Sequence, residues 1–128
     1  LLEHAPLSLL CFLEVNREPT EHILNELREA AEKFRETGCA LHLVLEGPED
    51  EGDPTLLRTL GALPEAAVWY GEFPDTVPAL ARRMYVDPDR LPLILLADRR
   101  NDGLYACSGY NVGTAELLLR MIAELEKA

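Results

Sequence analysis

The chain has 128 residues, of which 48% are hydrophobic and 27% are charged, values typical of one globular domain. Twelve Lys and Arg side chains against 23 Asp and Glu give a net charge of −11, which excludes a general attraction to nucleic-acid phosphates or anionic lipids. The longest unbroken apolar runs, Leu9–Leu13 and Leu93–Ala97, are too short to cross a bilayer. We expect a single domain over residues 1–128. Because the first residue is Leu1 rather than Met, we expect it to be part of a longer protein.

The hydrophobic pattern predicts alternating strands and helices. The near-continuous apolar stretch Leu7–Val15 is typical of a strand covered on both faces. From Thr20 the apolar residues recur every three to four positions, which predicts one long amphipathic helix ending near Gly38. The remaining predicted elements are a strand at Ala40–Glu46, a helix at Pro54–Leu63, a strand at Ala66–Tyr70, a helix at Pro74–Met84, a strand at Leu91–Ala97, a strand at Leu104–Ser108 and a helix after Gly113. Helical crossovers make the first strands parallel, and the polar turn Asp98–Gly103 predicts an antiparallel hairpin.

Three widely spaced cysteines, Cys11, Cys39 and Cys107, form no CxxC pair, which argues against a zinc ribbon and a disulfide framework. Cys11 and Cys39 have no adjacent Lys, Arg or His that would stabilise a thiolate. In the expected sheet, the Leu91–Ala97 strand separates Cys11 from Cys107, a span unfavourable for a disulfide. We therefore expect three free, unreactive thiols.

Other chemistry-bearing motifs are weak. His4, His22 and His42 show no HxH or HxxxH spacing, so we expect no metal site or catalytic histidine. The acidic segment Glu49–Asp53 lacks the alternation of an EF-hand loop and reads as a solvated loop. The sequence has no GxSxG elbow and no good match to a glycine-rich nucleotide loop. We expect no metal and no cofactor.

The aromatic pair Trp69-Tyr70, followed by Phe73, lies in the short third strand. Two alternatives remain open for it. The aromatics form an interface patch at the edge of the sheet, or they pack under the Pro74–Met84 helix.

The element order β-α-β-α-β-α-β-β-α, with Leu91-Pro92-Leu93 opening the hairpin and Gly103 at its turn, resembles the thioredoxin fold, most closely its TlpA-like and peroxiredoxin-related branch. The best segment is Leu91–Leu118, LPLILLADRRNDGLYACSGYNVGTAELL. The resemblance implies an α/β domain with a five-stranded mixed sheet of order 3-2-1-4-5 flanked by helices. It also implies that Pro92 is in the cis form and faces the active-site loop.

In that family, a CxxC motif begins the long helix after the first core strand, where the helix N-terminus lowers a thiol pKa. Here Arg17-Glu18-Pro19-Thr20 occupies that position, and both thiols are missing. Without a thiolate there is no nucleophile for disulfide exchange, and a peroxidase role fails for the same reason. We therefore expect no enzyme activity.

The leading hypothesis is a redox-inactive accessory or protein-interaction domain of a larger bacterial protein, exported if the resemblance to TlpA-like domains extends that far. Its partner would be a protein or a neighbouring domain of the parent chain, with no nucleic acid and no membrane insertion. The expected binding groove, at the carboxyl end of a central strand, is formed by Arg17, Glu18, Pro19, Thr20, Leu91 and Pro92.

Three alternatives remain. The first is that Arg17–Thr20 is only the solvated start of a helix, with Glu18 or Thr20 as the capping residue and the Arg17 side chain free in water. The second is a thiol oxidoreductase with an atypical single cysteine. The third is a structural spacer beside a catalytic domain, for instance a transglutaminase-like one.

Overall fold

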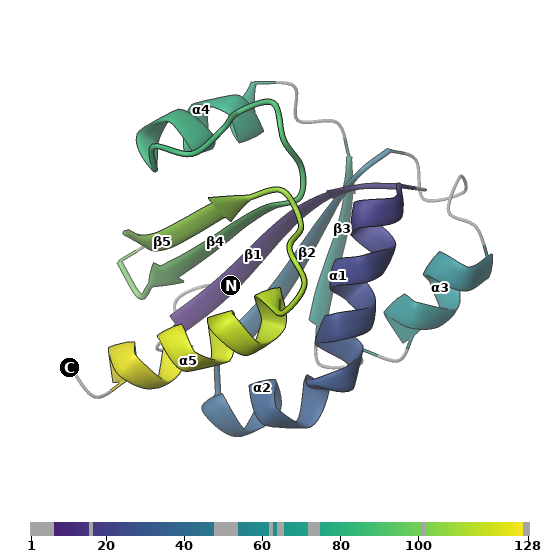
Figure 1. Cartoon of the computed structure of the whole chain (residues 1–128), viewed down its shortest axis with the longest axis horizontal. Coiled ribbons are helices and arrows are strands. Elements are labelled where there is room, and N and C mark those ends of the chain that lie inside the picture. Colours follow the sequence, from purple (N-terminus) through teal and green to yellow (C-terminus); the bar gives the residue numbers. More distant parts are fainter. Residues whose placement is uncertain are drawn as a thin grey trace.

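The computed structural model describes residues 7–15, 17–47, 54–61, 63, 66–71, 75–100 and 102–126. His4, Glu49–Asp53 and Phe73 lie outside these residues, so the predictions about them stay predictions. The elements follow the predicted order, except that two helices replace the single helix predicted after the first strand (Figure 1). They are β1 (Leu7–Glu14), α1 (Glu18–Glu29), α2 (Ala31–Thr37), β2 (Ala40–Glu46), α3 (Pro54–Gly61), β3 (Ala66–Gly71), α4 (Thr76–Arg83), β4 (Leu93–Asp98), β5 (Gly103–Ser108) and α5 (Thr114–Glu126).

The strands form one five-stranded mixed sheet in the order β3-β2-β1-β4-β5. β1 pairs in parallel with β2, and β2 with β3, because a helical crossover joins each pair of strands. β4 pairs antiparallel with both β1 and β5. This arrangement confirms the predicted α/β class, strand order and hairpin. The Leu91–Pro92 peptide bond before β4 is cis, as the resemblance implied.

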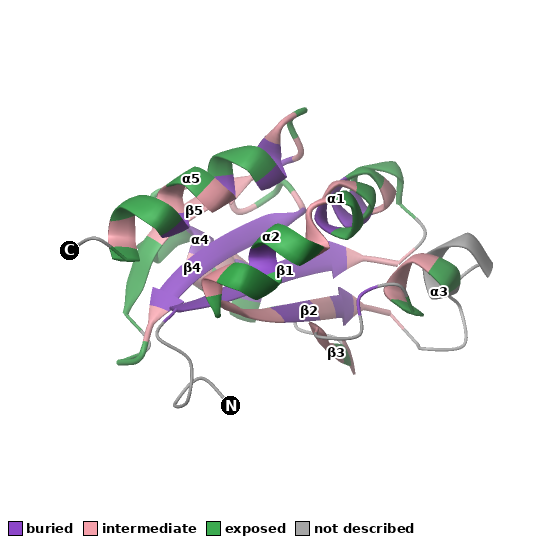
Figure 2. Cartoon of the chain, turned by 90° about the horizontal axis from the view of Figure 1, so that it is seen from below, coloured by how far each residue is buried: buried purple, intermediate pink, exposed green. Residues whose placement is uncertain are grey.

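The two faces of the sheet carry cores of different size, because successive side chains of a strand point to opposite faces. The larger core joins odd-numbered residues of β1 to buried residues of α1, α2 and α5. The smaller core joins Phe12 and Leu93 to Val77 and Ala81 of α4. Figure 2 shows β1 and β4 as the buried centre of the sheet, with the exposed residues of α1, α2 and α5 on the outer sides of those helices. None of the described helices has the length and apolar character needed to cross a membrane.

The prediction of one helix from Thr20 to near Gly38 is wrong. The chain turns at Ala30 (φ −99°, ψ 9°), which separates α1 from α2, and α2 runs at a marked angle to α1 (Figure 1). After the turn, Phe34 is 5% exposed and belongs to the larger core. The burial of this large aromatic ring favours the turn over a continuous helix. The break contains neither Gly nor Pro, so the sequence pattern does not signal it.

Candidate functional site

An open groove of about 510 Å³ lies at the carboxyl end of β1. It brings together the start of α1, the loop before β4 and the loop after β5, three segments that are far apart in the sequence. Of the predicted site residues, Arg17–Thr20 and Leu91 line it, whereas Pro92 is buried and does not. The groove is lined by Glu14, Arg17, Glu18, Pro19, Thr20, His22, Asp89, Arg90, Leu91, Gly109 and Tyr110.

The start of α1 is fixed to the end of β1 by a buried hydroxyl. Thr20 is 2% exposed, and its Oγ1 donates a hydrogen bond of 2.6 Å to the carbonyl oxygen of Glu14. Arg17, the N-cap of α1, has no side-chain capping hydrogen bond. Its Nε lies 3.5 Å from Oε2 of Glu14, with the Arg17 side chain 67% exposed. Neither Glu18 nor Thr20 therefore caps the helix with its side chain, whereas the high exposure of Arg17 agrees with the alternative of a solvated helix start.

The opposite wall is formed by the loop before β4 and by Gly109. The backbone N–H of Gly109 donates a hydrogen bond of 2.9 Å to the carbonyl of Pro92. Gly109 has φ +79°, and a Cβ built there would lie 2.8 Å from Nη2 of Arg90. The left-handed backbone favours glycine at this position, and the absence of a Cβ lets the Arg90 guanidinium lie directly against it. In the described part of the chain, no carboxylate lies within ion-pair distance of Arg90.

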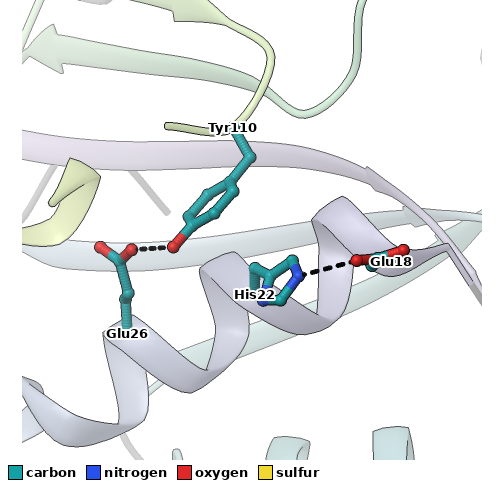
Figure 3. A network of polar contacts seen from close by, with 4 residues as sticks. All are labelled: Glu18, His22, Glu26 and Tyr110. Carbon is teal, nitrogen blue, oxygen red and sulfur yellow. Dashed lines mark hydrogen bonds and ion pairs between the residues drawn. The ribbon is translucent and has the colours of Figure 1, made fainter. Parts of the chain in front are cut away.

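A row of polar contacts runs from the groove to the N-terminus of α5 (Figure 3). Nε2 of His22 lies 3.2 Å from Oε1 of Glu18. The rings of His22 and Tyr110 stack with centroids 5.2 Å apart and planes at 15°. The Tyr110 hydroxyl donates to the carboxylate of Glu26. This carboxylate also accepts the backbone N–H groups of Gly113 (3.2 Å) and Ala115 (2.9 Å).

The hydrogen bonds in this row determine the protonation of Glu26. Burial raises the pKa of the Glu26 carboxyl, but the hydrogen bonds from Tyr110, Ala115 and Gly113 lower it more, so the pKa lies below its ordinary value. The same contact, through the hydrogen bond to Glu26, raises the pKa of Tyr110 to about 12. Glu26 is therefore charged and Tyr110 protonated at neutral pH. Sequence analysis missed both residues, because 84 positions separate them and no local pattern links them.

No protein-family model and no curated protein matches this sequence. Solved structures do match it. A candidate thiol:disulfide interchange protein DsbE from Chlorobium tepidum superposes with a TM-score of 0.69 at 18% identity, covering 95% of this chain and 81% of that chain. StoA from Bacillus subtilis gives 0.59 at 14% identity, with coverages of 91% and 81%. A thioredoxin-like protein from Aeropyrum pernix gives 0.61 at 13% identity, with coverages of 91% and 78%.

The fold is thioredoxin-like. Identities this low establish the fold alone, so activity has to be argued from the side chains of this chain. In this thioredoxin-like domain, Arg17 is the N-cap of α1 and Thr20 lies in its first turn. No cysteine lines the groove.

The three cysteines of this thioredoxin-like domain lie in or beside the sheet, and all are free. Cys11 and Cys107 both pair with Ile94 of β4, which lies between them. Burial raises the pKa of the Cys11 thiol far above its ordinary value. Burial, followed by the carboxylate of Glu126, raises the pKa of Cys39 to about 12, and burial also raises that of Cys107. These surroundings disfavour the thiolate at all three positions.

A thiol titration tests this conclusion. In the folded protein near neutral pH, all three thiols should react with a chromogenic disulfide at least about tenfold more slowly than after unfolding. In denaturant, three thiols should be counted. One thiol that reacts rapidly below pH 7 in the folded protein would contradict the assignment.

The histidines of the described chain are dispersed. His22 lies in the groove wall, whereas His42 is 7% exposed within β2. Within the described ranges, no three His, Cys, Asp or Glu side chains come together in a group that could hold a metal ion.

Proposed function

We propose that the chain is a redox-inactive thioredoxin-like domain that binds an extended protein segment in the groove. The segment comes from a partner protein or from a neighbouring domain of the same protein. One observation carries this proposal: the groove is open, yet no cysteine lines it. The resemblance aligns Arg17 and Thr20 with the two cysteines of the family, and their side chains contact Glu14.

The charges in the groove indicate which groups of a ligand are recognised. Arg17 lies beside Glu14, and His22 lies beside Glu18. Arg90 has no carboxylate within ion-pair distance among the described residues, and Gly109 leaves room for its guanidinium. An acidic side chain or a free C-terminal carboxylate of the ligand would form a charge-assisted hydrogen bond with Arg90.

Selection from a phage-displayed random-peptide library tests the proposal. The immobilised chain should enrich peptides with a shared pattern that includes a carboxylate. The Arg90→Glu variant should bind the selected peptides at least about tenfold more weakly. Arg100→Glu, with the same charge change in the exposed turn between β4 and β5, is the matched control. If no peptide is enriched, or if Arg90→Glu binds the selected peptides as tightly as the parent chain does, the groove is not a peptide-binding site and the structural-spacer alternative is favoured.

Thiol–disulfide exchange through a single cysteine is a second candidate function, because two of the similar structures are described as thiol:disulfide interchange proteins. The raised pKa values of Cys11, Cys39 and Cys107 oppose it. The thiol titration described above decides between the two functions.

A further inference from the structure

β3 is an edge of the sheet and lies away from the groove. It pairs on one side only, with β2, and no strand of the described chain lies on its other side. An edge strand directs alternate backbone N–H and C=O groups outward, where they can pair with another strand. Natural edge strands are usually protected by Lys, Pro or bulges, but β3 reads AAVWYG and contains no charged residue and no proline. The strand is thus chemically open to pairing.

The two aromatic residues of β3 point to opposite faces of the sheet. Tyr70 is partly buried and packs against the larger core. Trp69 is 42% exposed and is the only tryptophan of the chain. It lies opposite Val44 of β2, and Val44 packs against the smaller core on the α4 face. The alternative in which both aromatics pack under the Pro74–Met84 helix is therefore wrong, because Tyr70 packs on the opposite face of the sheet and Trp69 remains on the surface at the edge.

The exposed indole is held in a defined position. Nε1 of Trp69 donates a hydrogen bond of 3.4 Å to Nδ1 of His42. His42 is 7% exposed, and burial lowers its pKa, which keeps the imidazole neutral so that Nδ1 can accept this bond. A large aromatic side chain that is already ordered loses little conformational entropy on binding, and such residues dominate binding energies at interfaces.

We propose that the edge of β3 binds an extended segment of a partner protein, which joins the sheet as a further strand and packs apolar side chains against Trp69. Main-chain hydrogen bonds would supply affinity, and the side chains facing Trp69 would supply selectivity. The net charge of −11 sets the chemistry of the occupant. It repels a second copy of the chain and attracts a segment that carries Lys or Arg. The occupant is therefore a basic strand with alternating apolar residues.

Fluorescence of the single tryptophan gives a direct test on the intact chain. The probe is the acetylated and amidated peptide Lys-Thr-Val-Thr-Val-Thr-Val-Lys. It should shift the emission of Trp69 saturably. The analogue with Glu at both ends should bind about tenfold more weakly. The basic peptide with N-methylated alternate residues should not bind, because it cannot form the backbone ladder.

Two variants locate the binding site. Ala67→Lys places a positive charge beside Trp69 on the same face of β3 and should weaken binding at least about tenfold. Ala123→Lys makes the same change at an exposed position of α5 and should bind as the parent chain does. If Ala67→Lys fails to fold, Trp69→Ser should show the same loss, read as anisotropy of a fluorescein-labelled peptide.

Three results would overturn the proposal. The first is no change of Trp69 emission with the basic peptide. The second is equal binding of the N-methylated analogue. The third is concentration-dependent dimerisation in sedimentation velocity that Ala67→Lys abolishes, since a second copy would then be the occupant of the edge.

Discussion

An Arg17→Cys/Thr20→Cys variant should catalyse the reduction of insulin by dithiothreitol at a rate about a hundredfold above that of the parent chain. Position 17 is the N-cap of α1 and position 20 is in its first turn, so the unpaired N–H groups and the helix dipole would lower the pKa of a thiol at position 17. The second thiol would resolve the mixed disulfide intramolecularly. Insulin precipitation, followed by turbidity, measures the rate.

Arg17→Ser/Thr20→Ser is the matched control. It removes the same guanidinium and methyl group without adding thiols, and it should remain at the rate of the parent chain. Ultraviolet absorbance of the thiolate gives the pKa of the new Cys at position 17, which should lie below the ordinary cysteine value. If the double-cysteine variant forms its disulfide and stays inactive, the groove differs from a thioredoxin-like active site in more than its two cysteines. An active parent chain would contradict the redox-inactive proposal directly.

Glu26→Ala should lower the free energy of unfolding by about 3 kcal/mol, the largest loss we expect from a single polar side chain. The carboxylate of Glu26 accepts hydrogen bonds from the Tyr110 hydroxyl and from two backbone N–H groups at the start of α5. Its removal leaves these donors unsatisfied and removes a negative charge from the positive end of the helix dipole. Tyr110→Phe removes one of the three bonds and should cost about 1 kcal/mol. Urea denaturation measures both changes.

The effect of Glu26 should depend on pH in one direction. Because its pKa in the folded chain lies below the ordinary value of 4.5, the carboxylate contributes stability that is fully present well above pH 4.5 and is lost as the pH falls through the folded value. The difference between the parent chain and Glu26→Ala should therefore shrink in acid. Glu29→Gln, at an exposed position three residues further along α1, should change stability by less than about 0.5 kcal/mol at either pH. Equal costs for the two variants would show that the contacts of Glu26 contribute nothing.

The order of elements could be predicted because local patterns determine it. From Leu7 to Leu13 the only polar residue is Ser8, so the stretch shows no alternation of apolar and polar residues. This pattern is typical of a strand that is covered on both faces. The hairpin between β4 and β5 follows from the polar turn Asp98–Gly103, in which Asp98 accepts the backbone N–H groups of Arg100 and Asp102. The short helical crossovers predict that the first three strands are parallel, and the family resemblance then predicts the order of all five strands.

Tertiary contacts decided what the sequence could not show. The turn at Ala30 allows Phe34 to be buried in the core, and neither Gly nor Pro marks the position of this turn in the sequence. The row of contacts from Glu18 through His22 to Glu26 depends on Tyr110. This residue lies in the loop after β5, for which the sequence pattern predicts only a connection between two elements. Glu26 itself lies on a helix face whose periodicity predicts solvent exposure. For the site, the positions of Arg17–Thr20 and Leu91 were predictable, but their wall partners Arg90 and Gly109 were not.

The construction of the groove from three distant segments links its occupancy to the unfolding equilibrium of the whole domain. The unfolded chain cannot assemble these walls, so a groove ligand binds the native state alone and raises its stability by mass action. At a free concentration one hundred times the dissociation constant, the gain is about 2.7 kcal/mol. For a domain of this size, that corresponds to a rise of roughly 10 °C in the melting temperature. A compound or peptide library can therefore be ranked by melting temperature alone, without an assay for any reaction.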